Sequence, residues 1–552
     1  MIEKILAFAV ERRVLVVLLT AFAAVYGATQ LVQLPVDAVP DITNRQVQIN
    51  AVAPSLGPTE MERQVSYPIE TAMAGMPGLV ETRSISRNGF AQVTVIFTDD
   101  TDLYFARQQV GERLTQAAGT LPPGVDPQIG PVSTGLGEVL MWTVDFAHPD
   151  GRGAPRARTG QPGWQNDGSY LTPEGQRLTT PEERLTYLRT VQDWIIRPQM
   201  RQVANVAGVD AIGGFVKQYE VAPDTVRLAA SGLSMTDLVD ALERGNVSSG
   251  AGVVERSGEG LVVRADARVS RGSEIANIVI AQRGGAPVRV VDVATISSGR
   301  EVRTGAASVN GHGAVVGTAL MLAGGNSRTV AAESAEKLEE IGAALPPGIV
   351  VTPVLDRSVL VDATISTVAK NLTEGALLVI VILFLLLGNF RAAIITALVI
   401  PLSMLLAAIG MVKGAVSGNL MSLGALDFGL IVDGAVIIVE NCLRRLAERQ
   451  HHENRLLSLQ ERLHEVMVAA REMIRPSVFG QAIIILVYLP LLAFDGVEGK
   501  MFAPMAIAVM LALAAAFILS LTFVPAMVAL LVTGKVEEKE PRVLAATRSR
   551  YE

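Results

Sequence analysis

Residues 419–441 read NLMSLGALDFGLIVDGAVIIVEN, and this stretch decides how the rest of the chain is interpreted. It is long and apolar enough to cross a bilayer, yet it contains Asp427, Asp433 and Glu440. A charged group at the centre of a bilayer costs on the order of 3 kcal/mol, so such residues normally face the inside of a helical bundle and have a function. The stretch therefore predicts a membrane helix at the centre of a bundle.

The three carboxylates are spaced as a ladder along this helix. Asp433 and Glu440 are seven residues apart and share a face, whereas Asp427 lies about 120° around the helix. Buried carboxylates with raised pKa values can take up and release protons, so we predict a proton relay of Asp427, Asp433 and Glu440. Glu440 is its weakest member, because it lies near the membrane interface. Structural ion pairing is the alternative, but no Lys or Arg lies in the middle of a predicted span. Three glycines would allow neighbouring helices to approach closely: Gly424, Gly429 and Gly434.

Five further apolar stretches accompany this one. Together they predict six membrane spans: 14–36, 368–388, 392–412, 417–441, 477–494 and 504–532. A cleaved signal peptide is the alternative for the first of them. Its apolar run is long for a signal peptide, and no clear cleavage site follows, so a span is favoured.

Composition and charge agree with a membrane protein. Half of the residues are hydrophobic and 18% are charged, against about 25% in a typical soluble domain. The net charge of −7 argues against nucleic acid as a partner, and a single cysteine excludes internal disulfides. With both termini inside, sixteen basic residues lie in inside segments and two in short outside loops. The positive-inside rule therefore predicts cytoplasmic termini and an external block over 37–367.

The first part of the external block has a β-α-β-β-α pattern. A strand at 45–53 and a helix at 58–76 precede two strands, 79–86 and 91–98, that flank the turn signal Asn88-Gly89. This order is that of a split βαβ unit. The acidic run 99–102 that follows could suggest a metal site, but capping of the next helix is the preferred interpretation.

The second part of the block is longer and more interrupted. A strand at 139–146 leads into a Gly/Pro-rich surface loop at 148–180. The sequence then predicts a helix at 181–205, strands within 208–221, and an insertion with a helix at 235–244 and a hairpin at 261–269. Later elements should return to the second unit: 287–296, 313–322, 327–344 and 348–354. His148 and His312 are isolated, and no nucleophile, base and orienting group converge, so we expect no enzyme activity.

Between the fourth and fifth spans, residues 445–475 are amphipathic and rich in charge. His451-His452-Glu453 could suggest a metal site. A cytoplasmic helix lying along the membrane surface is the preferred interpretation.

Three segments carry a family resemblance: LPVDAVPDITNRQVQINAVAPSLGPTEMERQVSYPIE at 34–70, ALVIPLSM at 397–404, and NLMSLGALDFGLIVDGAVIIVENCLRRL at 419–446. With them the chain resembles the heavy-metal efflux branch of the resistance-nodulation-division (RND) transporters. The resemblance implies a homotrimeric proton antiporter of the Gram-negative inner membrane. It further implies a periplasmic adaptor protein and an outer-membrane channel as partners.

The same resemblance implies how the chain is divided. The N-terminus and first span would occupy 1–36, followed by two periplasmic porter subdomains of split βαβ (ferredoxin-like) type at 37–132 and 133–367. The second would hold a docking-type insertion at about 180–280. The remaining five spans would occupy 368–533, and a cytoplasmic tail 534–552.

The pattern DFG-x3-D-x6-E looks like the cobalt–zinc–cadmium or nickel type of this branch, because the copper–silver type lacks an acid at the Asp427 position. Methionines outside the membrane are scattered, which weighs mildly against a thioether site for Cu(I). The transported substrate would be a divalent metal cation and the coupling ion H⁺, with no cofactor. The sequence identifies neither the metal nor its ligands.

Family members are about twice as long and consist of two similar halves, of which this chain resembles the N-terminal one. The resemblance places the basic partner of the carboxylates and most of the metal-binding cleft in the second half, which would then be a required partner. Three alternatives remain: a non-functional truncated half, a half-sized export-accessory membrane protein, and a drug exporter of the same superfamily.

Overall fold

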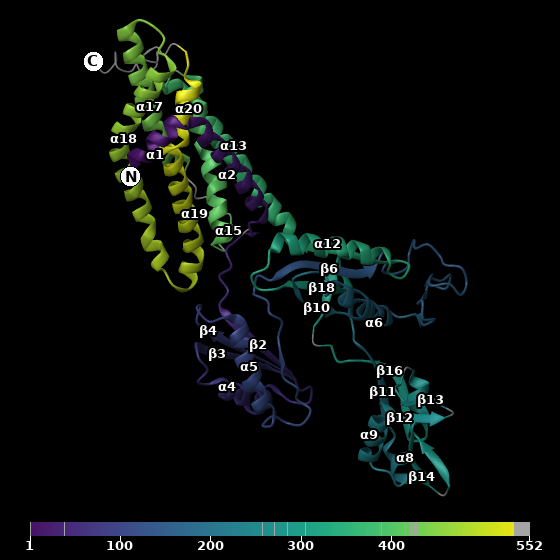
Figure 1. Cartoon of the computed structure of the whole chain (residues 1–552). Coiled ribbons are helices and arrows are strands. Elements are labelled where there is room, and N and C mark those ends of the chain that lie inside the picture. The colour runs from purple at the N-terminus through teal and green to yellow at the C-terminus, as the bar shows by residue number, and fades with distance from the viewer. Residues whose placement is uncertain are drawn as a thin grey trace.

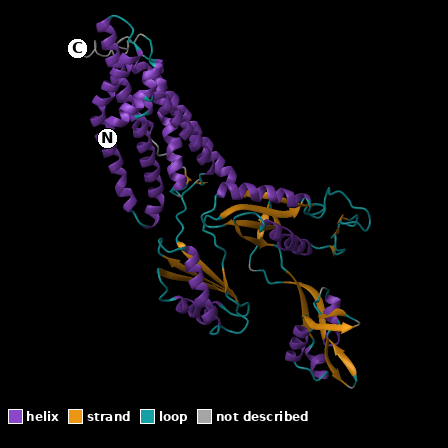
Figure 2. Ribbon diagram, viewed as in Figure 1, coloured by secondary structure: helices purple, strands orange, loops and turns teal. Residues whose placement is uncertain are grey.

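The protein consists of a helical bundle with α+β units beyond one of its ends (Figures 1 and 2). The structure is a computed structural model. It describes residues 2–37, 39–256, 258–269, 271–283, 285–303, 305–387, 389–414, 416–419, 422 and 428–534.

The bundle is built mainly from long apolar helices. Its largest core joins the two ends of the chain to the middle, with Leu6, Ile395, Ile438 and Val524 all buried in one cluster. The described helices of the bundle are α1 (Ile2–Glu11), α2 (Arg13–Gln33), α13 (Arg357–Leu387), α14 (Phe390–Ala397), α15 (Val399–Lys413), α17 (Phe428–Glu453), α18 (Leu459–Tyr488), η3 (Leu489–Ala493), α19 (Gly496–Leu521) and α20 (Phe523–Leu531).

Five stretches within the described residues are long and apolar enough to cross a membrane: Arg13–Gln33, Arg357–Ile382, Phe390–Lys413, Leu459–Ala493 and Gly496–Leu521. Each overlaps a predicted span. The predicted span at 417–441 lies partly outside the described residues, so the number six is not confirmed. The helix predicted to begin at 368 begins earlier, at Arg357, because Val361 is buried against Leu34 and Met411.

The first α+β unit has the predicted order of elements. Its sheet has the strand order β3-β4-β2-β5, and the predicted hairpin is confirmed by pairing of Arg87 with Phe90. Gly89 has φ +68, and a Cβ there would lie 2.9 Å from Cα of Pro54, so the turn requires glycine. The elements are β2 (Arg45–Val52), α3 (Pro58–Met61), η1 (Glu62–Ser66), α4 (Tyr67–Met73), β3 (Leu79–Arg87), β4 (Phe90–Phe97), α5 (Leu103–Ala118) and β5 (Gln128–Ile129).

The second α+β unit has a sheet of order β10-β18-β6-β19, with β17 added beside β18. The segment 148–180, predicted as a surface loop, instead contributes to the core of this unit. Trp164 and Tyr170 are buried in that core, and the Tyr170 hydroxyl donates to the carbonyl of Pro347 at 2.9 Å. The elements are β6 (Glu138–Phe146), β7 (Gly163–Trp164), β8 (Tyr170–Leu171), β9 (Arg177–Leu178), α6 (Pro181–Val191), η2 (Gln192–Ile196), α7 (Arg197–Met200), β10 (Val206–Gly213), β17 (Ala307–Val309), β18 (His312–Met321), α12 (Ser327–Ala343) and β19 (Ile349–Asp356).

A third, smaller unit occupies 217–300, which corrects the predicted insertion at 180–280. Its two ends, β11 and β16, pair from Lys217↔Arg300 to Pro223↔Ala294, and it has its own core around Leu228 and Val293. The strands predicted near 287–296 therefore belong to this unit. The predicted hairpin at 261–269 is wrong in its bounds, because a glycine-rich strand, β12, pairs with β13. The elements are β11 (Lys217–Pro223), α8 (Thr225–Ala230), α9 (Met235–Arg244), β12 (Ser248–Arg256), β13 (Glu259–Asp266), α10 (Gly272–Ala276), β14 (Val279–Arg283), β15 (Ala286–Arg289), α11 (Val290–Val293) and β16 (Ala294–Arg300).

The single surface helix predicted at 445–475 is also corrected. This segment forms the end of α17 and the beginning of α18, joined by a turn. Asn454 adopts φ 50 in this turn, and the Ser458 side chain caps α18. The charged stretch is therefore a helical hairpin at the end of the bundle away from the α+β units (Figure 1).

Several contacts between described residues join the bundle to the rest of the chain, among them the following. β1 (Val36–Asp37) pairs in parallel with β20 (Gly418–Asn419). Nε of Arg357 lies 3.3 Å from Oδ1 of Asp37, and Nζ of Lys500 lies 2.6 Å from Oδ1 of Asp99.

Candidate functional site

Two of the three predicted carboxylates, Asp433 and Glu440, lie on α17. Asp433 and Glu440 are both exposed on it, together with Gly429 and Ile437. These positions are three or four residues apart, so they form one continuous face. Asp427 and Gly424 lie outside the described residues.

The other side of α17 packs into the bundle. Ile431, Ala435, Ile438 and Val439 are buried there. Gly434 lies on this side, and a Cβ at Gly434 would be 3.5 Å from Nε2 of Gln481 in α18 and 3.6 Å from Oγ of Ser520 in α19. Gly434 thus lies close to two other helices, while its neighbour Asp433 is on the exposed face.

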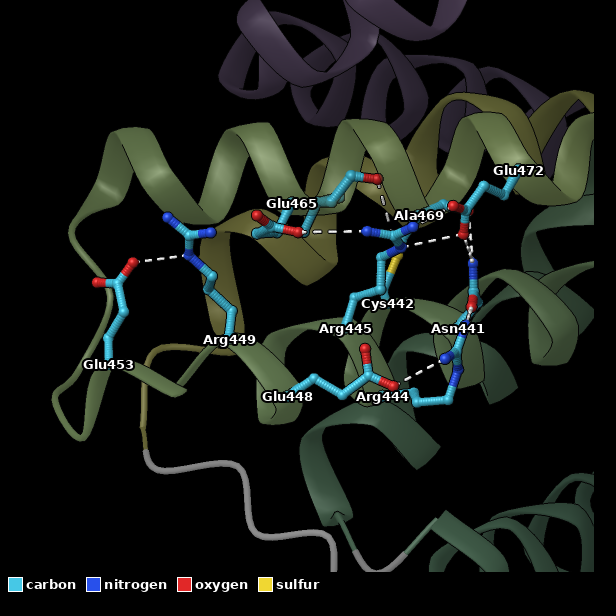
Figure 3. Close-up of polar contacts among 11 residues, drawn as sticks. Asn441, Cys442, Arg444, Arg445, Glu448, Arg449, Glu453, Glu465, Ala469 and Glu472 are labelled. Atoms are coloured by element: carbon cyan, nitrogen blue, oxygen red, sulfur yellow. Dashed lines mark hydrogen bonds and ion pairs between the residues drawn. The ribbon is translucent and has the colours of Figure 1, made fainter. Parts of the chain in front are cut away.

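A polar cluster fixes the C-terminal half of α17 to α18 (Figure 3). The Arg445 guanidinium donates to the Glu472 carboxylate, through Nε at 3.0 Å, and lies 3.8 Å from Oε2 of Glu465. The Asn441 amide donates to the carbonyl of Ala469 at 2.8 Å and to Glu472 at 3.2 Å. Glu472 therefore accepts hydrogen bonds from two residues of α17, one of them adjacent to Glu440.

The remaining members of the cluster form polar contacts within α17 or pack against α18. Arg444 donates to Glu448 at 2.8 Å and to the Asn441 side-chain oxygen at 2.7 Å, and Arg449 pairs with Glu453 at 2.7 Å. Cys442 is buried, and its Sγ lies 3.9 Å from the carbonyl of Val466. Of these contacts, the one between Cys442 and Val466 joins α17 to α18, and the others lie within α17.

The candidate metal ligands outside the bundle have other partners. Asp102 accepts from the backbone N–H of Phe105 at 2.8 Å, which confirms capping of α5, and Asp99 pairs with Lys500. Within the part of the chain that the structure describes, no three His, Cys, Asp or Glu side chains lie together as metal ligands would.

Two polar residues near α17 were missed from the sequence. Ser477 and Gln481 lie in α18, four residues apart and directly after Pro476, and both side chains are buried. Their spacing inside an apolar run was a visible signal, but their position beside Gly434 depends on how the helices pack.

Helices that can cross a membrane, with α+β units beyond them and carboxylates on a bundle helix, define the chain as part of a membrane transporter. Residues 5–552 match the AcrB/AcrD/AcrF family, and the chain belongs to this family of transporters.

Two similar proteins are heavy-metal resistance proteins. The chain is 63% identical over 551 residues to the nickel-cobalt-cadmium resistance protein NccA of Alcaligenes xylosoxydans xylosoxydans, covering all of this chain and 51% of the relative. It is 52% identical to the cobalt-zinc-cadmium resistance protein CzcA of Cupriavidus metallidurans, covering all of this chain and 50% of the relative. A crystal structure of a heavy metal efflux pump matches with a TM-score of 0.78 and 32% identity, over 96% of this chain and 48% of that one. The chain spans about half the length of these relatives.

Proposed function

We propose that the chain is the N-terminal half of a proton-driven efflux pump for divalent heavy-metal cations of the nickel, cobalt, zinc and cadmium group. The observation that carries this proposal is the 63% identity over the whole chain with a nickel-cobalt-cadmium resistance protein. The pump would be a homotrimer in a Gram-negative inner membrane, with a periplasmic adaptor and an outer-membrane channel as partners. The 37–367 block would then be periplasmic.

The coupling chemistry is assigned to the carboxylates of the stretch 427–440. Asp427, Asp433 and Glu440 would bind and release the coupling protons, and Gly424, Gly429 and Gly434 would let neighbouring helices approach them. The exposed positions of Asp433 and Glu440 support this assignment, because a helix of the second half could pack over both. Metal release to one side and proton entry to the other would be linked through the protonation state of this face. The pump would need no resident cofactor, since the metal ion is cargo.

The test uses a fusion in which residues 1–552 replace the matching half of the nickel-cobalt-cadmium relative. In a metal-sensitive host with the adaptor and channel, the fusion should restore growth in nickel and cobalt. Asp433→Asn should abolish this resistance, because Asn is nearly isosteric with Asp but cannot titrate. Asp150→Asn, in an exposed loop, is the matched control. Unchanged resistance and proton flux in the Asp433→Asn fusion, at normal protein level, would refute the assignment.

A further inference from the structure

The exposed face of α18 changes from charged to apolar within one helical turn. Arg471 and Arg475 are exposed on it, and Phe479, Ile483 and Leu486 follow on the same side of the helix. These positions are three or four residues apart, so they form one continuous face. On a helix that crosses a membrane, such a change marks the level at which lipid headgroups give way to acyl chains. The membrane surface on α18 therefore lies between Arg475 and Phe479.

The beginning of α2 shows the same change. Arg12 and Arg13 lie at its first turn, and the large apolar side chains of Val14 and Leu15 are exposed directly after them. The candidate membrane span begins at Arg13. The membrane surface on α2 therefore lies at its first turn.

The short helix α1 lies at this level and is fixed to α18. It contacts α18 and α20, and the Arg471 guanidinium donates to the Glu3 carboxylate (Figure 1). The hydrogen bond from Arg471 and the nearby charge of Arg475 lower the pKa of Glu3, so both arginines lie at this end of α1. On the inner side of α1, Leu6 and Val10 are buried in the core of the bundle.

The outer side of α1 combines apolar and basic side chains. Ile5 and Phe8 are 40% and 50% exposed, which is unusual for large apolar side chains in contact with water. Lys4 and Arg12 are exposed on the same side, one near each end of the helix. This arrangement is typical of a helix that lies in the membrane surface, with its apolar side chains toward the acyl chains and its cations at the headgroups.

The cations at the membrane surface differ from those of the α17–α18 hairpin in their partners. Within the residues that the structure describes, Lys4, Arg12 and Arg475 form no ion pair, and Nε of Arg13 is buried without a hydrogen-bond partner. The arginines of the hairpin have carboxylate partners: Arg444 with Glu448, Arg445 with Glu472, Arg449 with Glu453, and Arg455 with Glu461. The unpaired positive charge is thus concentrated where a lipid headgroup would lie.

We propose that the outer face of α1 and the adjoining face of α18 bind an anionic phospholipid, with Lys4 and Arg475 at its phosphate and Ile5 and Phe8 among its acyl chains. Glu3 does not cancel this charge, because Arg471 already neutralises it. The long side chains of Lys4 and Arg475 can extend along apolar surface and keep their charged ends at the phosphate. Each cation near an anionic membrane surface strengthens binding roughly fivefold.

The test is native mass spectrometry of the 552-residue chain in detergent, titrated with phosphatidylglycerol or with phosphatidylcholine of the same acyl chains. The unmodified chain should bind phosphatidylglycerol more tightly. Lys4→Met combined with Arg475→Met should weaken phosphatidylglycerol binding on the order of tenfold or more and leave phosphatidylcholine binding nearly unchanged. Equal affinity of the unmodified chain for the two lipids would overturn the proposal.

The matched control is Arg444→Met combined with Arg449→Met, which removes the same charge from the hairpin. This control should keep the preference for phosphatidylglycerol, and so should Lys4→Arg combined with Arg475→Lys, which keeps the charge at the proposed site. An equal loss of preference in the hairpin control would show that net charge alone attracts the lipid and would overturn the site. Excess inorganic phosphate should not displace the lipid, and displacement would show a site for a free anion instead.

Discussion

Thr180 and Glu183 form a reciprocal cap at the beginning of α6. The Thr180 hydroxyl accepts from the N–H of Glu183 at 3.2 Å, and the Glu183 carboxylate accepts from the N–H groups of Thr179 at 2.6 Å and Thr180 at 3.0 Å. These hydrogen bonds hold the pKa of Glu183 below its ordinary value. The cap matters for the second α+β unit, because α6 packs against β18 and β6 through Leu188 and Val191.

We expect Thr180→Ala to cost about 1 kcal/mol of local stability, which is about fivefold faster opening of the first turn of α6. Hydrogen exchange of the peptide over residues 181–191 measures this directly. Glu182→Gln, one residue away and outside the cap, is the control. Exchange of this peptide that is identical in Thr180→Ala and the unmodified chain would contradict the capping role.

The contribution of Glu183 to the stability of α6 should depend on pH in a defined direction. Because the pKa of Glu183 is lowered in the folded state, its charge stabilises α6 fully at a pH above the unfolded-state pKa of about 4.3. This stabilisation is lost as the pH falls through the folded-state pKa. Glu183→Gln should therefore open α6 faster than the unmodified chain at pH 7, and the difference should shrink on acidification below about pH 4. A difference that grows on acidification would show that the charge of Glu183 destabilises α6.

At the scale of elements, α17 and α18 are held together by pairs that cross between them. The side chains of Arg445 and Glu472 are 30% and 37% exposed, so their pairing is partly screened by solvent. In a double-mutant cycle with Arg445→Met and Glu472→Gln, we expect a coupling of roughly 0.5–1 kcal/mol at low salt. In 1 M salt it should fall, because the Debye length is then only about 3 Å. Thermal unfolding of the chain in nanodiscs measures both.

Arg444 and Glu448 supply the matched comparison for that cycle. They pair four residues apart within α17 and have 49% and 51% exposed side chains. Their coupling should be smaller, about 0.3–0.5 kcal/mol, because an exposed pair within one helix does not join two elements. A larger coupling for this pair than for Arg445 and Glu472 would contradict the assigned role of Glu472.

Elements that are determined by neighbouring residues could be predicted from the sequence. Elements that depend on pairing between residues far apart in the chain could not. Asn88-Gly89 predicted its hairpin because the turn geometry is set by those residues, and five stretches of membrane length followed from apolar runs. The limits of the third unit were missed because they depend on β11 meeting β16, 71 residues apart at their closest pair, Pro223↔Ala294.

The same distinction applies to the residues of the candidate site. Asp427, Asp433 and Glu440 stand out because carboxylates are rare in apolar runs, and their proton-relay role stays a prediction. Glu472 and Gln481 could not be assigned from the sequence, because only the antiparallel register of α17 and α18 brings them to Asn441 and Gly434.

At the scale of the molecule, the exposed carboxylates indicate that another helix covers one face of α17. Asp433 and Glu440 are exposed on α17, and exposure to lipid would be costly for a charged group. The chain spans about half the length of its relatives, so under the proposed function we expect the second half of the transporter to cover this face of α17.

We therefore expect the 552-residue chain expressed alone to insert in the membrane and to confer no metal resistance. Co-expression with the separate complementary half of the nickel-cobalt-cadmium relative should restore growth in nickel and cobalt, because a helix from that half would bring a basic residue to the carboxylates of α17. Leaving a buried charge unpaired costs several kcal/mol, so replacing that basic residue by Met should remove resistance again.

The measurements are growth in graded metal concentrations and co-purification of the two halves. Replacing Lys337, which pairs with Glu340 within α12 of the second α+β unit, by Met is the control in this chain. Full resistance from the 552-residue chain alone would show that it is not half of a pump.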